Sequence, residues 1–238
     1  MGYLDYYKYQ ATARGVRSVQ DVYRIAHEKA YVYDRIVLPW LPADKNSPIA
    51  ELACGHGSFL AWLKEQQFQK LVGADSSAEQ IQFARQIGAE VFETDFKSWL
   101  ASEPDSSREA IVAIDLIEHI SKDEFMDLLG DSSRVLARGG RLILRYPNGD
   151  SPLVGRNLFN DITHVWTYTT NCIETLGRMH GFSRFDFVDE SSAAIRDSRW
   201  LKVPLSKLGT GVLKLLFRAA TKEQIDFWSP HIWAALQK

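Results

Sequence analysis

Short apolar runs alternate with amphipathic segments along most of the chain, from about residue 48 to residue 189. Continuous apolar runs of a few residues are typical of buried strands, whereas apolar residues at every third or fourth position indicate helices. Strands that alternate with helices predict parallel βαβ units with right-handed crossovers, and hence an α/β fold. The predicted strands are 48–53, 70–75, 90–94, 110–115, 140–146 and 184–189, and the predicted helices are 58–66, 77–87, 122–137 and 169–180.

An additional helical segment precedes this pattern. Val19, Val22 and Ala26 are spaced as the buried face of a helix, and the two prolines in Leu38-Pro-Trp-Leu-Pro indicate where that helix ends. We therefore expect residues 1–47 to form an N-terminal helical cap in front of the α/β core.

The regular pattern ends after Asp189. A second domain is expected over 48–238, and an amphipathic segment is inserted into it near 190–226. Within that segment, residues 205–220 are either an ordinary packed helix or an interfacial helix that contacts a membrane. The apolar residues near 231–236 are expected to add a last strand to the sheet.

Composition narrows the class of protein. The 238 residues are 45% hydrophobic and 24% charged, which is ordinary for a globular protein with a sizeable core. A formal net charge of -2 argues against nucleic acid as a partner, because sequence-independent binding needs a basic face. The two cysteines do not suggest a disulfide framework, and no targeting signal or long apolar span occurs. These features predict a cytoplasmic protein, with at most peripheral contact at the inner face of a membrane.

Two glycines follow directly after the first predicted strand. Gly55 and Gly57 let the backbone approach a ligand closely, and the next helix offers free N–H groups. Leu60 stands where a dinucleotide fingerprint has its third glycine, so the indication for NAD is weak. Asp75 ends the second strand, where a carboxylate accepts hydrogen bonds from ribose hydroxyls. A dinucleotide-binding oxidoreductase and a non-catalytic Rossmann module remain as alternatives at this point.

The segment from Glu51 to Gly57 resembles motif I of class I S-adenosylmethionine-dependent methyltransferases, written E/D-x-G-x-G-x-G, with Ala53 in place of the first glycine. The segments 114–119 and 136–144 are similar to that family's motif IV and to its turn into the fifth strand. The resemblance implies a Rossmann-like seven-stranded sheet in the order 3-2-1-4-5-7-6 with an antiparallel last strand. It also implies S-adenosyl-L-methionine as cofactor, bound by Glu51, Ala53, Gly55, Gly57, Asp75, Ser76, Asp95, Phe96 and Asp115.

The segment from Asn160 to Thr169 resembles a block, G-D-x-T-H-x-x-x-[FY]-T, of bacterial sugar O-methyltransferases that act on O-antigen or capsule polysaccharides. A similar arrangement in metal-dependent 2′-O-methyltransferases of small RNAs holds Mg²⁺ against a vicinal diol. Carried over residue by residue, the resemblance implies a site for Mg²⁺ or another divalent metal. Its ligands would be Asp115, Glu118, His119 and His164.

The sequence also allows an acceptor site without metal. Glu118 and His119 would then cap the following helix, and His164 would act as the general base, with Asp161 or Asp115 orienting its imidazole. The catalytic candidates are therefore His164, His119 and Asp161. We expect an O-methyltransferase acting on a sugar hydroxyl of a polysaccharide, a lipopolysaccharide or a precursor, with a quinone-precursor or RNA 3′-end hydroxyl as the alternative acceptor.

Overall fold

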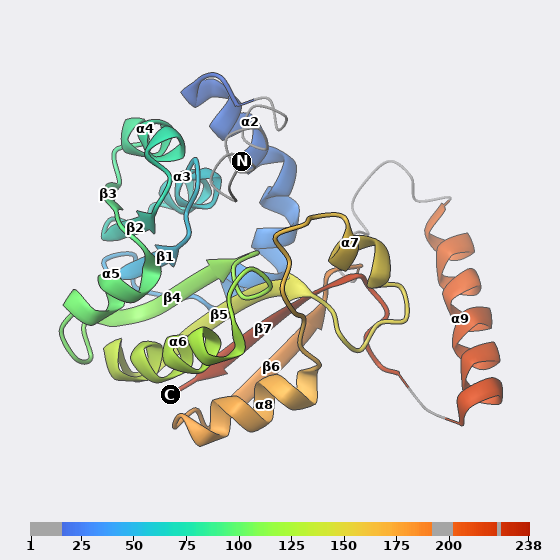
Figure 1. The fold of residues 1–238 in the computed structure, drawn as a ribbon. Helices are drawn as coiled ribbons and strands as arrows, with labels where there is room; N and C mark the ends of the chain where they lie inside the picture. The colour runs from blue at the N-terminus through green and yellow to red at the C-terminus, as the bar shows by residue number, and fades with distance from the viewer. Residues whose placement is uncertain (1–15, 192–201, 223–224) are drawn as a thin grey trace.

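The computed structural model describes residues 16–191, 202–222 and 225–238. At its centre is a seven-stranded sheet in the order β3-β2-β1-β4-β5-β7-β6, in which β7 runs antiparallel to both neighbours (Figure 1). The predicted strand order and the antiparallel last strand are thereby confirmed. The strands are β1 (Ile49–Leu52), β2 (Leu71–Asp75), β3 (Glu90–Glu93), β4 (Arg108–Ile114), β5 (Leu136–Pro147), β6 (Arg184–Asp189) and β7 (His231–Gln237).

Helices cover both faces of the sheet (Figure 1). Several begin where the sequence provides a capping side chain: Ser121 and Glu124 form a reciprocal capping box at the start of α6, which satisfies backbone N–H groups that the helix leaves unpaired. The helices of the core are α3 (Ser58–Glu65), α4 (Ala78–Gln86), α5 (Phe96–Ser102), α6 (Lys122–Val135), α7 (Gly155–Phe159) and α8 (Thr170–Met179).

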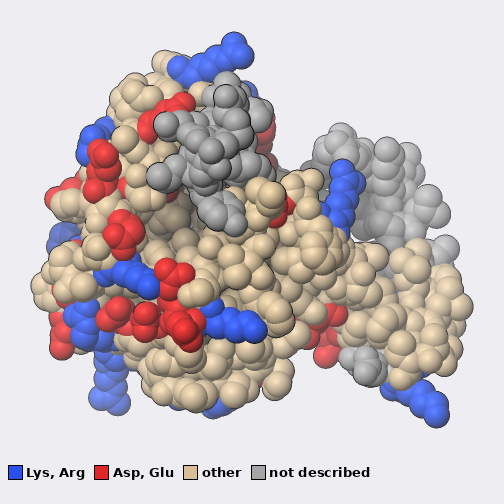
Figure 2. All heavy atoms as spheres, viewed as in Figure 1, with Lys and Arg blue, Asp and Glu red and all other residues tan. Residues whose placement is uncertain are grey.

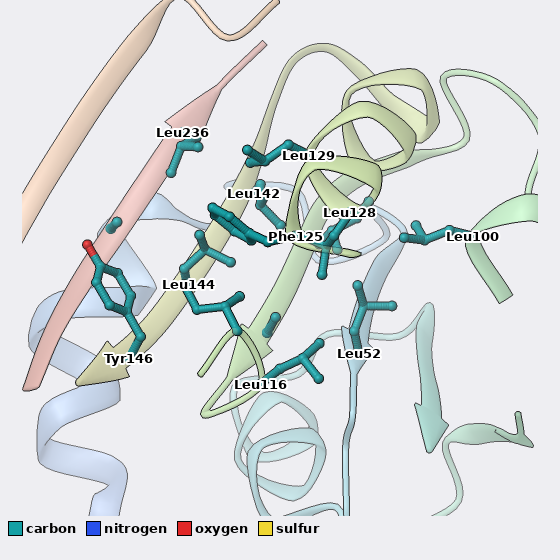
Figure 3. Packing of buried hydrophobic residues seen from close by; sticks show 14 of the residues in the cluster. Leu52, Leu100, Leu116, Phe125, Leu128, Leu129, Leu142, Leu144, Tyr146 and Leu236 are labelled. Atoms are coloured by element: carbon teal, nitrogen blue, oxygen red, sulfur yellow. The ribbon is translucent and has the colours of Figure 1, made fainter. Parts of the chain in front are cut away.

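Neighbouring residues of the central strands pack into different cores. Leu142 and Leu144 of β5 belong to the core under α5, α6 and α8, whereas Ile143 belongs to the core under α2 and α3. This division follows from the period of two in a strand, which points successive side chains to opposite faces. Figure 3 shows the first core, where Leu142, Leu144 and Phe125 meet between β5 and α6. Both faces are buried, as the apolar runs of these strands predict.

The N-terminal helical segment packs into the same hydrophobic core as one face of the sheet. Its main helix, α2 (Val19–Val32), begins at Ser18, whose side chain accepts from the N–H of Asp21, and continues into a π-turn (Tyr33–Val37) and a 3₁₀ turn (Leu38–Trp40). Tyr33 lies 5.1 Å from Phe59 and 6.0 Å from Trp233, measured between ring centroids. The helix predicted from the apolar spacing is present, although residues 1–15 of the predicted cap lie outside the described residues.

The segment after β6 contains one long helix, α9 (Lys202–Thr221), which stands apart from the sheet and its covering helices in Figure 1. On the face of the molecule that Figure 2 shows, acidic and basic side chains are interspersed over the main body. Among the described residues, none of the helices is both long enough and apolar enough to span a bilayer.

One boundary and two short helices differ from the prediction. Strand β5 begins at Leu136 rather than near residue 140, because Leu136 pairs with Arg108 across an irregularity in the ladder with β4. The short helices α5 and α7 were not predicted, since seven and five residues hold too few turns to reveal a helical period.

Candidate active site

Most of the predicted cofactor-binding residues lie at the carboxyl ends of β1, β2, β3 and β4, where an open α/β sheet places its ligand crevice. Gly55 and Gly57 lie between β1 and α3 with φ angles of 53° and 85°, in the left-handed region that favours glycine. A Cβ added to Gly57 would lie 2.5 Å from Cδ1 of Ile87, so the loop packs closely against the end of α4. Glycine at this position therefore serves both the turn and the packing.

Asp75 fixes the conformation of the glycine loop. Its Oδ2 accepts from the N–H of Gly55 at 2.7 Å, and its Oδ1 accepts from the N–H of Ser77 at 2.8 Å. Burial raises the pKa of Asp75, and these two hydrogen bonds oppose the increase. Ser76 lies between Asp75 and Ser77 in the sequence, at the same edge of the sheet. The carboxylate that was predicted to bind a ribose thus also orders the loop from Gly55 onward.

Glu51 presents an unsatisfied polar atom at the same edge. It is the third residue of β1, and its Oε2 is buried without a hydrogen-bond partner among the described residues. Burial raises the pKa of Glu51 well above its ordinary value, and the charge of Asp75 adds to this effect. A buried carboxyl oxygen without a partner is costly, so the arrangement favours a ligand that donates a hydrogen bond here.

Ala53 has a φ of 53°, which is the left-handed region, although it is not glycine. A side chain costs roughly 1–2 kcal/mol in that conformation, and glycine loses about 0.5–1 kcal/mol more backbone entropy on folding. The change Ala53→Gly is therefore expected to raise the free energy of unfolding by up to about 1 kcal/mol, measured by urea denaturation. The control Ala50→Gly, in strand β1 just before Ala53 and without a positive φ, should lower it by about 1 kcal/mol or more. A loss of stability in both variants would contradict the strain at Ala53.

Asp95 and Phe96 begin helix α5 at the carboxyl end of β3. Asp95 is the N-cap, and its carboxylate accepts from the backbone N–H of Ser98 at 2.9 Å and from the hydroxyl of Ser98 at 2.7 Å. These hydrogen bonds lower the pKa of Asp95. Phe96 is half-buried and packs against the core under α5. These two residues therefore have a capping and packing role, and their contact with the cofactor stays a prediction.

Asp115 lies at the end of β4 in a charge network that sequence analysis missed. Its carboxylate is bound by the guanidinium of Arg145, whose Nε and Nη2 donate to Glu190 at 2.6 and 2.9 Å. Trp233 donates to the same Glu190 at 2.9 Å. Burial alone would raise the pKa values of Asp115 and Glu190, but the positive charge of Arg145 lowers both. A signal was available, because Arg145 interrupts the apolar run of β5.

Glu118, His119 and His164 come together on the acceptor side. One ligand atom from each lies within 4.8 Å of the other two, and the two imidazole rings are 4.6 Å apart between centroids. Only 2% of Glu118 is exposed, and its Oε2 has no hydrogen-bond partner among the described residues. Burial and the charge of Asp115 raise the pKa of Glu118, while burial and the neighbouring His164 lower the pKa of His119 to about 4. Three of the four predicted metal ligands are thus gathered, and Asp115 is not among them.

Asp161 occupies a different place from the one predicted. Its Oδ1 accepts from the hydroxyl of Thr163 at 2.6 Å and from the N–H of Thr163 at 2.9 Å, while Thr163 Oγ1 lies 2.8 Å from Nδ1 of His119. His164 instead contacts the carbonyl oxygen of Leu158 through Nδ1, at 2.9 Å. The side-chain contacts therefore connect the carboxylate of Asp161, through Thr163, to the imidazole of His119 rather than to that of His164, because the turn from Asp161 to Thr163 directs the hydroxyl toward the segment after β4.

A family described as a methyltransferase domain matches residues 25–186, more than half of the chain. Trans-aconitate 2-methyltransferase of Azoarcus sp. (strain BH72) is 32% identical over 126 residues, which cover 50% of this chain and 46% of that protein. The chain thus spans about half the length of this curated relative.

Solved structures share the fold at low sequence identity. A SAM-dependent methyltransferase of Archaeoglobus fulgidus has a TM-score of 0.68 at 18% identity, covering 89% of this chain and 94% of that one. Geranyl diphosphate C-methyltransferase of Streptomyces coelicolor, in complex with Mg²⁺, geranyl diphosphate and S-adenosyl-L-homocysteine, has a TM-score of 0.63 at 14% identity, with coverages of 92% and 83%. Phosphoethanolamine N-methyltransferase 2 of Haemonchus contortus, in complex with S-adenosyl-L-methionine, has a TM-score of 0.59 at 14% identity, with coverages of 94% and 60%.

Proposed function

The chain belongs to the methyltransferase family that matches residues 25–186, and from this we propose that it methylates a sugar hydroxyl of a polysaccharide, a lipopolysaccharide or a precursor. Use of S-adenosylmethionine follows from the family. The choice of acceptor depends on one observation: the cluster of Glu118, His119 and His164 beside the carboxyl end of β4. A hydroxyl is a poor nucleophile unless its proton is removed, and this cluster holds the groups that can remove it.

The residues of the glycine loop fit S-adenosylmethionine, which when bound supplies a methyl group on a positively charged sulfur. Glu51 would accept a hydrogen bond from the cofactor's amino group at its buried Oε2, which has no partner among the described residues. Asp75 would accept from the ribose while it holds Gly55 in place. Gly55 and Gly57 shape the turn with their positive φ angles, and the N–H groups at the start of α3 would be available to the cofactor.

His164 is suited to take the proton of the acceptor hydroxyl. Its Nδ1 contacts the carbonyl oxygen of Leu158, which holds the ring in one orientation, and it lies next to His119 in a half-buried position. His164 and His119 would also position the acceptor hydroxyl and exclude water from it.

The donor set of Glu118, His119 and His164 also fits a divalent cation. One carboxylate and two imidazoles suit Mn²⁺, Fe²⁺ or Co²⁺ better than Mg²⁺, which prefers oxygen ligands. A bound cation would lower the pKa of a sugar hydroxyl coordinated to it. Asp115, the fourth ligand implied by the resemblance, forms an ion pair with Arg145. It would therefore support the three ligands and would not contact the metal itself.

The carboxyl groups around the acceptor side argue against trans-aconitate as the acceptor. Glu118 and Asp161 are both buried here, and the nearby guanidinium of Arg145 is already engaged by Asp115 and Glu190. A tricarboxylate would have to bind next to these carboxyl groups, and its negative charges are unfavourable beside each of them that is ionised. An RNA 3′ end would meet the same difficulty, in a chain whose net charge is -2.

The acceptor assignment is tested by transfer of label from methyl-tritiated S-adenosylmethionine to a panel of probes. The panel contains UDP-, GDP- and dTDP-sugars, deacylated lipopolysaccharide, trans-aconitate and a catechol. We expect at least tenfold faster transfer to a sugar-containing probe than to trans-aconitate or the catechol. Labelling confined to trans-aconitate or to the catechol would refute the sugar acceptor and leave the family assignment intact.

Helix α9 supports peripheral contact with an anionic membrane surface through residues 205–220. Leu215 and Leu216 are 68% and 60% exposed, and the described part of the helix is mostly uncharged surface in Figure 2. The segment 202–222 has five basic residues and no acidic one: Lys202, Lys207, Lys214, Arg218 and Lys222. An apolar face combined with basic residues is the pattern of a helix that lies in the headgroup layer of anionic lipids.

Co-sedimentation with vesicles tests this contact. We expect more protein to sediment with vesicles of phosphatidylglycerol and phosphatidylcholine than with phosphatidylcholine alone, and less as salt is raised. The double variant Leu215→Glu/Leu216→Glu should stay in solution, whereas Met179→Glu, at an exposed apolar residue of α8, should sediment as the wild type does. The proposed contact would be overturned if both variants sedimented equally. It would also be overturned if the wild type formed a dimer and did not sediment with vesicles.

A further inference from the structure

We propose that Thr163 is a positioning residue that, together with Asp161, fixes the His119 imidazole in the tautomer that carries its proton on Nδ1. This inference rests on the proposed function, because it assigns a task to the groups behind the cluster of Glu118, His119 and His164.

The direction of each hydrogen bond follows from counting donors. An ionised carboxylate only accepts, and Asp161 Oδ1 lies 2.6 Å from the hydroxyl of Thr163, so this hydroxyl donates its single proton to Asp161. Thr163 Oγ1 then has only lone pairs left for its second neighbour, which is Nδ1 of His119 at 2.8 Å. His119 must therefore donate from Nδ1, and in the neutral ring its Nε2 carries the lone pair.

The same count applies to the neighbouring ring. Nδ1 of His164 lies 2.9 Å from the carbonyl oxygen of Leu158, and a carbonyl only accepts, so His164 also donates from Nδ1. In the neutral form of each ring the lone pair that accepts a proton or a metal ion is then on Nε2. An outer carboxylate or carbonyl that fixes the tautomer in this way is typical of histidines that ligate metals.

The hydroxyl of Thr163 is not needed to hold its loop in place. The backbone N–H of Val165 donates to the carbonyl oxygen of Glu118 at 2.7 Å, which attaches the loop directly to the segment after β4. The N–H of Thr163 also donates to Asp161, and this bond would persist without the hydroxyl. The backbone of Thr163 also hydrogen-bonds His119 and is kept when the side chain is changed. Removal of the hydroxyl alone should therefore weaken the preference of His119 for the Nδ1–H tautomer without releasing the loop.

The test compares Thr163→Val, which has nearly the same shape but no hydroxyl, with Thr163→Ser, which retains the hydroxyl. Long-range ¹⁵N–¹H spectra of histidine side chains distinguish the two neutral tautomers, and a His119→Gln variant assigns the His119 signals. We expect the Nδ1–H pattern for His119 in the wild type and in Thr163→Ser, and a shift toward the Nε2–H pattern in Thr163→Val. An unchanged pattern in Thr163→Val, with native circular dichroism, would overturn the proposal.

Titration with Mn²⁺ separates this inference from the proposed function. Loss of an outer hydrogen bond to a ligating histidine costs about 10–100-fold in metal affinity, so Thr163→Val should bind Mn²⁺ at least tenfold more weakly and Thr163→Ser should recover the affinity. If the wild type binds no Mn²⁺ but shows the expected tautomers, the metal site fails while the role of Thr163 stands. If Mn²⁺ binds equally to all three proteins, the metal site stands and the role of Thr163 fails.

Discussion

Replacement of His164 by alanine is expected to reduce methyl transfer by at least about 10²–10⁴-fold, because positioned proton transfer contributes that much to a reaction rate. The affinity for S-adenosylmethionine should stay within about twofold of wild type. His164 lies beside His119, whereas the glycine loop and Asp75 that would hold the cofactor lie at the ends of β1 and β2. Single-turnover transfer and calorimetric titration with the cofactor measure the two quantities separately.

His27→Ala is the matched control for this change. His27 is an exposed histidine of α2 whose Nε2 lies 2.8 Å from Oε1 of Glu65. It does not belong to the acceptor cluster of Glu118, His119 and His164. Its loss should leave transfer within about twofold of wild type. Normal transfer by the His164 variant would refute the assignment of the acceptor site, and a parallel loss of cofactor affinity would show that the change disturbed the loop instead.

Arg145→Met is expected to lower the free energy of unfolding by about 2–4 kcal/mol at neutral pH. Removal of one partner of a fully buried ion pair costs about 3–5 kcal/mol, because the other charge stays buried without compensation. The expected loss of stability is smaller than for a fully buried pair because Asp115 is 35% exposed, although Arg145 is only 12% exposed. The side chain of methionine retains most of the packing volume, so the loss reports on the charge. Urea denaturation at neutral pH measures it.

The dependence of this loss on pH checks its origin. The pKa values of Asp115 and Glu190 are lowered in the folded protein, so their stabilisation is present above the ordinary range of about 4 and is lost as the pH falls through the lowered values. The difference between wild type and Arg145→Met should therefore shrink below about pH 4. A constant difference would point to packing instead of charge. Arg178→Met, which removes an exposed pair with Glu174, should cost less than about 1 kcal/mol at either pH.

The order of elements was predictable because hydrophobic periodicity and glycine placement are local properties of the sequence. Each buried strand appears as an apolar run, and Gly55 and Gly57 have the positive φ angles that a tight strand-to-helix turn requires. The start of β5 was missed because Leu136 pairs with Arg108, a contact that depends on the neighbouring strand rather than on local pattern. Helix α5 was missed because its seven residues hold too few turns to reveal a helical period, and the capping role of Asp95 produces no periodic signal.

The composition of the acceptor cluster was predictable in part, and only by resemblance. His119 and His164 are 45 positions apart in the numbering, and no local rule joins them; the resemblance to methyltransferase motifs placed both at one site. The resemblance did not reveal which side chain orients which ring. That depends on a single turn, from Asp161 to Thr163, and on a guanidinium, Arg145, that engages Asp115.

The position of β7 between β5 and β6 also determines when the sheet can be completed during synthesis. Strand β6 is translated before β7, and among the described residues its ladder partner is β7. Until residues 231–237 have emerged from the ribosome, the outer edge of β5 presents unpaired backbone groups, an arrangement that invites pairing with other chains. A nascent chain should therefore depend on chaperones up to the arrival of β7, even though the rest of its core has already been made.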